Sequence, residues 1–310
     1  MDETVLTNLK QLFGSRLKEN APVSAFCTAQ TGGKADILLV VNSAAELREA
    51  ALRLWQTSLP FRVLGAGSNL LIADQGYRGV VIINRAKAYQ IHAEANPPYL
   101  WAESGANLGG LARQAAIQGL SGLEWAAPVP GTLGGAVYGN AGAHGGDMAG
   151  NLVLADILHP SGEMTQWNAS QMAYQYRSSV LKRSAEKAVI LSATLRLTPS
   201  TRQQVTALMT KNLEQRRRTQ PPGASMGSMF KNPTGDYAGR LIEAAGLKGA
   251  RVGGAQISPL HANFFVNTGS ATAADIYQLI HQTRQAVQER FGVLLDLEIE
   301  LLGDFEAVQS

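Results

Sequence analysis

The sequence predicts a mixed α/β fold, and three observations support this. Short apolar runs of strand length alternate with helical patterns along most of the chain. Hydrophobic residues make up 45% and charged residues 16% of the 310 residues, which is enough to build buried cores. After Pro199 a long helical pattern follows where strands had dominated. We therefore expect two or three modules, with one boundary near Pro199.

Composition and charge exclude several classes of protein. The chain has 27 basic and 24 acidic residues and a net charge of +3, which is too even for a nucleic-acid-binding protein. Its single cysteine, Cys27, excludes an internal disulfide and a cysteine-based metal cage. We find no signal peptide and no run of about 18 apolar residues. We therefore expect a cytoplasmic protein with neither a nucleic acid nor a membrane as partner.

The first part of the chain is predicted to alternate strands and helices. Strands are expected at Ile37–Val41, Phe61–Leu64, Val80–Ile83 and Leu100–Glu103. A helix over 43–56 begins with the pattern of a capping box, because Ser43 is followed three residues later by Glu46. Asn107 is expected to cap a second helix, with Gly119 as its left-handed C-terminal residue.

The later part of the chain is predicted to be richer in helix. Helices are expected at Thr201–Arg218, Tyr237–Ala245 and Ala273–Arg290. Strands are expected around Leu152–Leu158 and Ala188–Leu197, with a closing strand at Val293–Leu302. Pro221 stops the first of these helices, whereas Thr272 caps the last one and Gly292 ends it.

The loop Gly65–Asn69 begins like a dinucleotide-binding fingerprint but lacks its third glycine, and no helix is expected after it. A Rossmann site needs a helix N-terminus for its pyrophosphate. This loop instead offers successive backbone N–H groups with the side chains of Ser68 and Asn69, a nest suited to an anion. Taken alone, the pattern favours a tight turn between strands over a binding loop.

The block Pro128–Gly142 is the most unusual stretch of the sequence. Small residues at nearly every second position would let a flat, bulky group lie against the backbone. Backbone amides could then reach ring heteroatoms without side chains intervening. A structural glycine-rich loop is the alternative, but the pattern Pro-Gly-Thr-x-Gly-Gly between apolar flanks favours a cofactor, and a flavin ring fits the description.

The segment Gly227–Pro233 places the hydroxyl of Ser228 three residues before the ammonium of Lys231 and four before Asn232. Serine donates a proton only when the developing alkoxide is stabilised, which Lys231 could do. The segment lacks the Gly-x-Ser-x-Gly elbow of a serine hydrolase. A turn with Ser228 as a capping residue is an equally good interpretation of the motif alone.

Arg177 and Glu298 are candidates that the pattern alone would not select. Arginine grips carboxylates with two parallel hydrogen bonds, but most such arginines are surface residues. Strand alternation places Glu298 on the face opposite its apolar neighbours, where an exposed carboxylate is the commoner case. His144 and His261 have no partner at ligand spacing, so we expect no metal site.

Taken together, these motifs resemble one family, the UDP-N-acetylenolpyruvoylglucosamine reductases. They occur in the order in which that family has them, over roughly residues 25–303. The segment Leu120–Gly146 contains the family's Gly-Leu-Glu, Pro-Gly-Thr-x-Gly-Gly and Asn-Ala-Gly elements. The segment Gly227–Pro233 resembles its Gly-Ser-x-Phe-Lys-Asn-Pro signature. The segments that carry the resemblance are Thr31–Asp36, Gly65–Leu71, Leu120–Gly146, Gly227–Pro233, Ala238–Glu243 and His261–Phe264.

The resemblance implies an FAD-binding fold of the vanillyl-alcohol-oxidase type, made of two α/β modules, and a C-terminal α/β module that binds the substrate. We expect boundaries at 1–80, 81–199 and 200–310. The compact stretch after Tyr176 resembles the shorter subgroup, which lacks an extra tyrosine-bearing loop. The implied cofactor is non-covalent FAD, the hydride donor is NADPH, and we expect a monomer.

The family's chemistry implies roles for the candidate residues. Hydride passes from NADPH to flavin N5, NADP⁺ leaves, and the enolpyruvyl sugar nucleotide then takes hydride at its terminal methylene carbon. Arg177 and Glu298 would stabilise an enolic intermediate and Ser228 would protonate the adjacent carbon. The implied FAD-binding residues are Leu64, Gly65, Ala66, Gly67, Ser68, Asn69, Leu70, Pro130, Gly131, Thr132, Gly134, Gly135, Ala136, Asn140, Ala141 and Gly142. The implied substrate-binding residues are Tyr176, Arg217, Lys231, Asn232, His261 and Asn263.

The chain departs from the family pattern at Glu300, where many members have an arginine, and the segment Arg177–Leu181 is plainer than usual. One alternative is a flavoprotein oxidase of the same superfamily, which would react with oxygen and tether its flavin through His144. Another is a nucleotide-binding protein that has lost turnover. That hypothesis expects Ser228 or Arg177 to be missing, and both are present.

Overall fold

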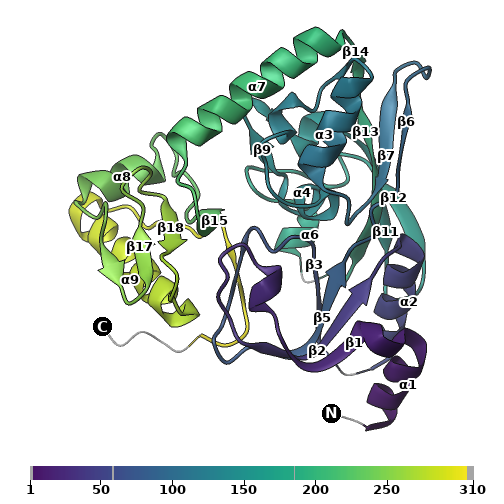
Figure 1. Cartoon of the computed structure of the whole chain (residues 1–310), viewed down its shortest axis with the longest axis horizontal. Helices are drawn as coiled ribbons and strands as arrows, with labels where there is room; N and C mark the ends of the chain where they lie inside the picture. Colours follow the sequence, from purple (N-terminus) through teal and green to yellow (C-terminus); the bar gives the residue numbers. More distant parts are fainter. Residues whose placement is uncertain (1–2, 58, 185, 306–310) are drawn as a thin grey trace. The chain divides into compact units, whose positions relative to one another are not determined.

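The computed structural model describes residues 3–57, 59–184 and 186–305 (Figure 1). These residues form two compact units. The first runs up to Leu17 and contains Leu39–Gly65 and Val81–Arg216. The second contains Lys18–Leu38, Ala66–Val80 and the chain from Arg217 onward. The expected division at 1–80, 81–199 and 200–310 stays a prediction.

The first unit is built on an antiparallel sheet of order β12-β11-β13-β7-β6. Its strands are β6 (Tyr89–His92), β7 (Tyr99–Glu103), β11 (Leu152–Leu158), β12 (Met164–Trp167) and β13 (Val189–Arg196). The central strand β13 is buried along nearly its whole length. Continuous burial of this kind means that both faces of the strand are covered.

Helices pack on this sheet, and two of them, α3 (Leu108–Ile117) and α4 (Leu133–Gly139), share an apolar core with it. Helix α2 (Ala44–Trp55) and helix α4 both pack on β13. The small residues of α3 allow a close approach to the segment around Trp125. Asn107 accepts a hydrogen bond from the N–H of Gly110 at 2.7 Å, and Gly119 has a φ of +72°. The predicted ends of α3 are therefore confirmed.

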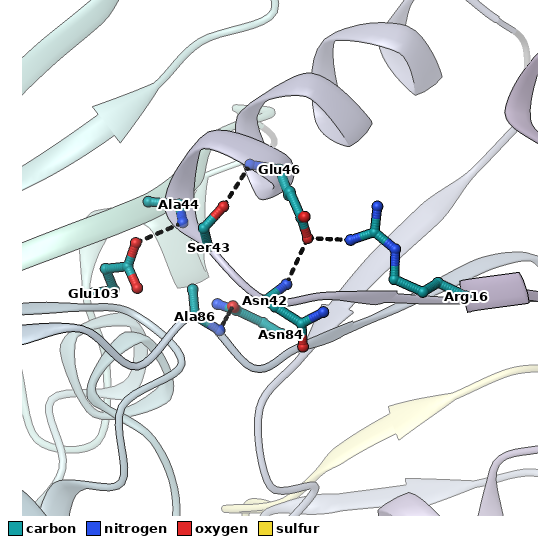
Figure 2. Close-up of polar contacts among 8 residues, drawn as sticks. All are labelled: Arg16, Asn42, Ser43, Ala44, Glu46, Asn84, Ala86 and Glu103. Atoms are coloured by element: carbon teal, nitrogen blue, oxygen red, sulfur yellow. Dashed lines mark hydrogen bonds and ion pairs between the residues drawn. The ribbon is translucent and has the colours of Figure 1, made fainter. Parts of the chain in front are cut away.

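Carboxylates fix the beginning of α2 (Figure 2). Ser43 accepts from the N–H of Glu46 at 3.2 Å, whereas the Glu46 carboxylate accepts from the N–H of Asn42 at 2.8 Å. This hydrogen bond from the Asn42 backbone, helped by Arg16, lowers the pKa of Glu46. Glu103 is buried and accepts from the first helical N–H, that of Ala44, at 2.8 Å. Side-chain oxygens thus satisfy two of the orphan N–H groups of the helix, those of Ala44 and Glu46.

The second unit contains an antiparallel sheet of order β15-β18-β17-β16, drawn in green to yellow in Figure 1. Helix α9 packs on β16 and β17 and also contacts α8. Phe230 and Phe265 are fully buried in this core and their rings meet edge to face. The elements are β15 (Ala224–Ser228), α8 (Ala238–Ala244), β16 (Arg251–Val252), β17 (Ala255–Ile257), β18 (Phe264–Asn267) and α9 (Ala273–Phe291).

The chain also contains several further elements. A further sheet has the order β1-β2-β5-β3, and β4 pairs in parallel with β19. No helix in the described ranges is long and apolar enough to cross a membrane. The remaining bounds are α1 (Glu3–Phe13), β1 (Leu17–Pro22), β2 (Lys34–Val41), β3 (Phe61–Leu64), β4 (Leu70–Ile72), β5 (Tyr77–Asn84), β8 (Leu120–Ser121), β9 (Gly142–Ala143), β10 (Gly146–Asp147), α5 (Met148–Asn151), α6 (Val180–Arg183), β14 (Thr198–Pro199), α7 (Arg202–Thr219) and β19 (Glu300–Leu302).

Two predicted features need correction. The closing strand was expected at Val293–Leu302, but only β19 is regular, and Glu298 lies in a bend before it. Leu297 makes a single isolated antiparallel bridge to Phe230, and bends at 298 and 299 separate it from β19. The glycine-rich block was not expected to be helical, yet its centre forms α4. The other predicted strands and helices are present, with bounds that differ by a few residues.

Candidate functional site

The loop Gly65–Asn69 connects β3 to β4, and no helix follows it, as predicted. Gly67 has a φ of +57°, and a Cβ atom there would lie 2.8 Å from the Cα of Cys27. Its carbonyl accepts hydrogen bonds from Thr28, from the N–H at 3.1 Å and from the hydroxyl at 3.3 Å. The loop is therefore held through this carbonyl, and Ala66 beside it is exposed.

The glycine-rich block is ordered around α4. The N–H groups of Leu133 and Gly134 donate to the carbonyls of Ala106 and Ser104, at 2.9 and 2.7 Å. A Cβ atom at Gly134 would lie 2.8 Å from the Cβ of Ser104, so this glycine is required for packing. Gly134 therefore ties the beginning of α4 to the connection between β7 and α3.

Gly135 and Gly139 leave one face of α4 without side chains. They are four residues apart, so they share a face of the helix. A Cβ atom at Gly139 would meet nothing within 4 Å among the described residues, and one at Gly135 would meet only the hydroxyl oxygen of Thr132 at 3.8 Å. Packing within the protein therefore does not explain these glycines. A bare backbone face of this kind fits a flat aromatic group, as the flavin hypothesis expects.

Within the first unit, the first residue of the predicted loop, Gly65, meets the glycine-rich block. Gly65 lies against the side chain of Thr132, and a Cβ atom at Gly65 would come within 2.8 Å of the Thr132 methyl carbon. This close approach explains why the loop begins with glycine. The structure thus brings Gly65 and the N-terminal residue of α4 together, although they are far apart in sequence.

Arg177 lies at the tip of a tight turn. Gln175 and Ser178 exchange two backbone hydrogen bonds, at 2.9 and 3.1 Å, with Tyr176 and Arg177 between them. Arg177 has a φ of +56°, the left-handed region that non-glycine residues seldom occupy. Its guanidinium lies 5.6 Å from the centroid of the Tyr176 ring, which is 55% exposed. Both predicted residues of this turn belong to the first unit.

Two residues that the sequence analysis missed attach this turn to α4. The hydroxyl of Tyr174 donates to the carbonyl of Val137 at 3.0 Å, and that of Ser179 donates to Tyr138 at 2.6 Å. These carbonyls belong to the last turn of α4, where the helix itself offers no donor. Burial, and then Asp147, raise the pKa of the Tyr174 phenol, so it stays a donor. No local pattern links these positions.

Ser228 ends β15 in the second unit, where it pairs with Phe264. The next residue, Met229, donates to the carbonyl of Asn263 at 2.8 Å and accepts from the N–H of Glu298 at 2.9 Å. The backbone of Met229 therefore connects the Ser228 segment to Glu298. The structure brings these two predicted catalytic segments side by side.

Asn69 joins the same group. Its side chain donates to the carbonyl of Glu298 at 3.1 Å, and its own carbonyl accepts from the N–H of Glu300 at 3.0 Å. Asn69 is predicted to bind the cofactor, so a cofactor segment is hydrogen-bonded to the Glu298 segment within the second unit. The two residues are 229 positions apart, and no sequence pattern indicates the contact.

The second unit also contains the predicted substrate-binding residues Arg217, Lys231, Asn232 and Asn263. Lys231 donates its backbone N–H to Asp296 at 2.8 Å, and Asn232 accepts from the first N–H of α8 at 3.1 Å. Asn263 is 3% exposed, and its amide pairs with both backbone groups of Phe230, at 2.9 and 2.8 Å. Arg217 is exposed near the end of α7.

His261 supports the same segment. Its Nδ1 atom accepts from the N–H of Asn263 at 3.2 Å, so the neutral ring carries its proton on Nε2. Burial lowers the pKa of this imidazole, and Lys248 adds to the effect. Within the described part of the chain, no three His, Cys, Asp or Glu side chains gather as a metal site would require.

Two family models match this chain. Residues 35–167 match the family described as "FAD binding domain". Residues 218–302 match "UDP-N-acetylenolpyruvoylglucosamine reductase, C-terminal domain". The mixed α/β FAD-binding fold with a C-terminal module is therefore confirmed.

Relatives match over nearly the whole chain. The UDP-N-acetylenolpyruvoylglucosamine reductase of Chloroflexus aggregans is 41% identical over 95% of this chain and 100% of its own length. That of Bacillus velezensis is 39% identical over 97% of this chain and 99% of its own. The crystal structure of the Thermus caldophilus reductase is similar with a TM-score of 0.79 and 35% identity, covering 93% of this chain and 99% of that one.

Proposed function

Because the chain belongs to the family of UDP-N-acetylenolpyruvoylglucosamine reductases, we propose that it reduces UDP-N-acetylenolpyruvoylglucosamine to UDP-N-acetylmuramate, a precursor of bacterial peptidoglycan. NADPH is the proposed reductant and non-covalent FAD the proposed cofactor. NADPH and the enolpyruvyl nucleotide would use the enzyme in turn, in a ping-pong sequence. The relatives cover the chain almost from end to end, which supports the activity of the whole protein.

FAD, when bound, supplies a two-electron carrier that accepts a hydride from NADPH and passes it to an unsaturated carbon. The bare face of α4 at Gly135 and Gly139 would lie against the flavin ring. The nest at Ala66 and Gly67 would hold the pyrophosphate. The remaining residues proposed to bind FAD lie within 64–70 and 130–142, as the resemblance implies.

Ser228 is the proposed proton donor. The substrate's terminal methylene carbon takes the hydride, and the adjacent carbon needs a proton to complete the product. The hydroxyl of Ser228 would donate that proton, and the ammonium of Lys231, three residues later in the sequence, would stabilise the alkoxide that forms. The position of Ser228 is supported by main-chain bonds on both sides of Met229.

Arg177 and Glu298 would stabilise the negative charge that develops on the substrate. A guanidinium binds a carboxylate with two parallel hydrogen bonds, so Arg177 is suited to the substrate's carboxylate. Glu298 would add a hydrogen bond if it is protonated. Tyr176, Arg217, Lys231 and His261 would contact the sugar nucleotide directly. Asn232 and Asn263, whose amides bind backbone groups, would act by holding this segment in place.

The observation that carries this proposal is the convergence in the second unit of Asn69, Glu298 and the Ser228 segment. A cofactor loop, a carboxylate and a proton donor come from three distant parts of the sequence. A nucleotide-binding protein without turnover has no need of a serine and a glutamate next to its cofactor loop.

Anaerobic spectroscopy tests the proposal. The purified protein should be yellow, NADPH should bleach it, and UDP-N-acetylenolpyruvoylglucosamine should restore the colour without oxygen. Acid should release the flavin intact. Colour that returns only on admission of air, with flavin retained on acid-denatured protein, would instead favour an oxidase tethered through His144. A colourless protein that cannot be loaded with FAD would contradict both.

A further inference from the structure

The side chain of Asn140 connects three segments of the first unit. Asn140 is the C-cap residue that follows α4 and has a φ of +47°. Its Nδ2 donates to the carbonyl of Gln175 at 3.0 Å, and its Oδ1 accepts from the N–H of Ala149 at 3.0 Å. A carbonyl needs a donor and an N–H needs an acceptor, so the two partners fix the orientation of the amide.

This amide is an interior contact and not a surface one. Asn140 is 6% exposed. Its partner Gln175 begins the turn that carries Arg177, and it exchanges two backbone bonds with Ser178. The Asn140 side chain therefore reaches from the glycine-rich helix to the base of the Arg177 turn. Both of its polar atoms are already used within the protein.

Only asparagine meets all the demands of this position. The left-handed backbone favours Asn, Asp or Gly. Aspartate would turn a carboxylate toward the Gln175 carbonyl and lose the donor, whereas glycine would keep the backbone and lose both bonds. The Arg177 turn itself has a strained φ of +56°, so it persists only if its surroundings hold it.

We propose that Asn140 is a positioning residue for Arg177, which sets the guanidinium relative to α4 and so to the substrate's carboxylate. The inference rests on the proposed function for the role of Arg177. It gives the Asn140 side chain a task apart from cofactor contact, because both of its polar atoms are bound within the protein. Tyr174 and Ser179 assist by binding the last carbonyls of α4.

A double-mutant cycle tests the inference on the holoenzyme. Asn140→Gly removes the side chain and keeps the left-handed backbone, and Arg177→Ala removes the guanidinium. The matched control is Asn212→Ala, since Asn212 is also 6% exposed and donates to a backbone carbonyl in the same core, that of Glu124 at 3.1 Å. The readout is the Kd for UDP-N-acetylmuramate, measured by calorimetry on the oxidised enzyme.

Asn140→Gly should raise this Kd roughly tenfold. That is the size expected when a buried hydrogen bond that positions a charged side chain against its ligand is lost. Arg177→Ala should raise it further, and the double variant should be within about twofold of Arg177→Ala, because Asn140 acts through Arg177. Asn212→Ala should leave the Kd unchanged within about twofold. Additive losses in the double variant would overturn the inference.

Hydrogen exchange separates this inference from the proposed function. Asn140→Gly should speed exchange of the Gln175 and Ser178 amides, which bond to each other across the turn, and Asn212→Ala should not. Unchanged exchange in Asn140→Gly overturns the role of Asn140, whatever the protein binds. Faster exchange in a protein whose wild type binds no UDP-N-acetylmuramate supports the Asn140 contact and contradicts the proposed function.

Discussion

The Arg177 turn of the first unit and the Ser228 segment of the second are held in different ways. Side chains attach the Arg177 turn to its surroundings, among them those of Tyr174, Ser179, Asn140 and Arg183. Main-chain bonds hold the Ser228 segment on both sides, and one buried residue, Asn263, completes them. A turn held by side chains can be loosened one residue at a time. A segment held by its backbone should tolerate changes of its own side chains, so chemistry and stability can be tested separately there.

The largest expected effect sharpens this contrast. Ser228→Ala should slow reoxidation of the reduced enzyme by the enolpyruvyl nucleotide roughly 10²–10⁴-fold, because the proposed proton donor is lost. Reduction by NADPH and thermal stability should change little, because main-chain bonds hold the segment. Stopped-flow absorbance separates the two half-reactions. The control is Ser225→Ala, on the same strand, where Ser225 pairs with Val266. Equal slowing by both variants would contradict the role of Ser228.

The next effect concerns stability. Asn263→Ala should lower the free energy of unfolding by about 2–4 kcal/mol, because both buried backbone groups of Phe230 lose their partner. Asn212→Ala, which removes one buried bond, should cost about 1 kcal/mol. Urea unfolding followed by circular dichroism measures both. If the two variants cost the same, Asn263 adds nothing special to the main-chain pairing that holds the Ser228 segment, and its proposed role there is wrong.

A smaller effect tests the bare face of α4. Gly135→Ala should raise the stability of the FAD-free protein by about 0.5–1 kcal/mol, because alanine favours a helix and the new methyl group meets no clash. The same change should weaken FAD binding about tenfold, since the methyl group would occupy the face proposed for the flavin. Flavin fluorescence measures the affinity.

Gly134→Ala is the matched control on the same helix. It should destabilise the protein with or without FAD, because its Cβ would overlap Ser104. Unchanged FAD affinity in Gly135→Ala would mean that the flavin lies elsewhere.

Local signals predicted most of the fold. Caps at Ser43, Asn107 and Thr272 and the glycine at Gly292 marked helix ends correctly, because each acts within a few residues of itself. The helix α4 was missed because glycine is a poor helix former, and here tertiary contacts to Ala106 and Ser104 compensate.

The site was less predictable than the fold. The expected strand at Glu298 was wrong because its apolar alternation cannot reveal a bend imposed by distant partners. The contacts from Asn69 to Glu298 and from Asn140 to Gln175 join distant positions and leave no local pattern. Motif order identified the candidate residues, but only the structure shows which of them hold one another in place.

The smallest expected effect is a pH dependence of stability that is confined to the Ser228 segment. Burial lowers the pKa of His261 below its ordinary 6.5. Between that value and the lower folded one, the unfolded chain binds a proton that the folded chain does not, so stability falls as the pH falls below about 6.5. Protonation would also remove the acceptor that Nδ1 offers to the N–H of Asn263.

His261→Asn tests this, because its Oδ1 can accept the same hydrogen bond without titrating. The variant should lose less stability than the wild type between pH 7.5 and pH 5.5 in thermal unfolding. Hydrogen exchange of the amides in the Arg177 turn should not respond to this change of pH, because Tyr174 keeps its proton throughout. If the turn responds as strongly as the Ser228 segment, the two regions are not held independently, and the contrast between side-chain and main-chain anchoring is the wrong description of this protein.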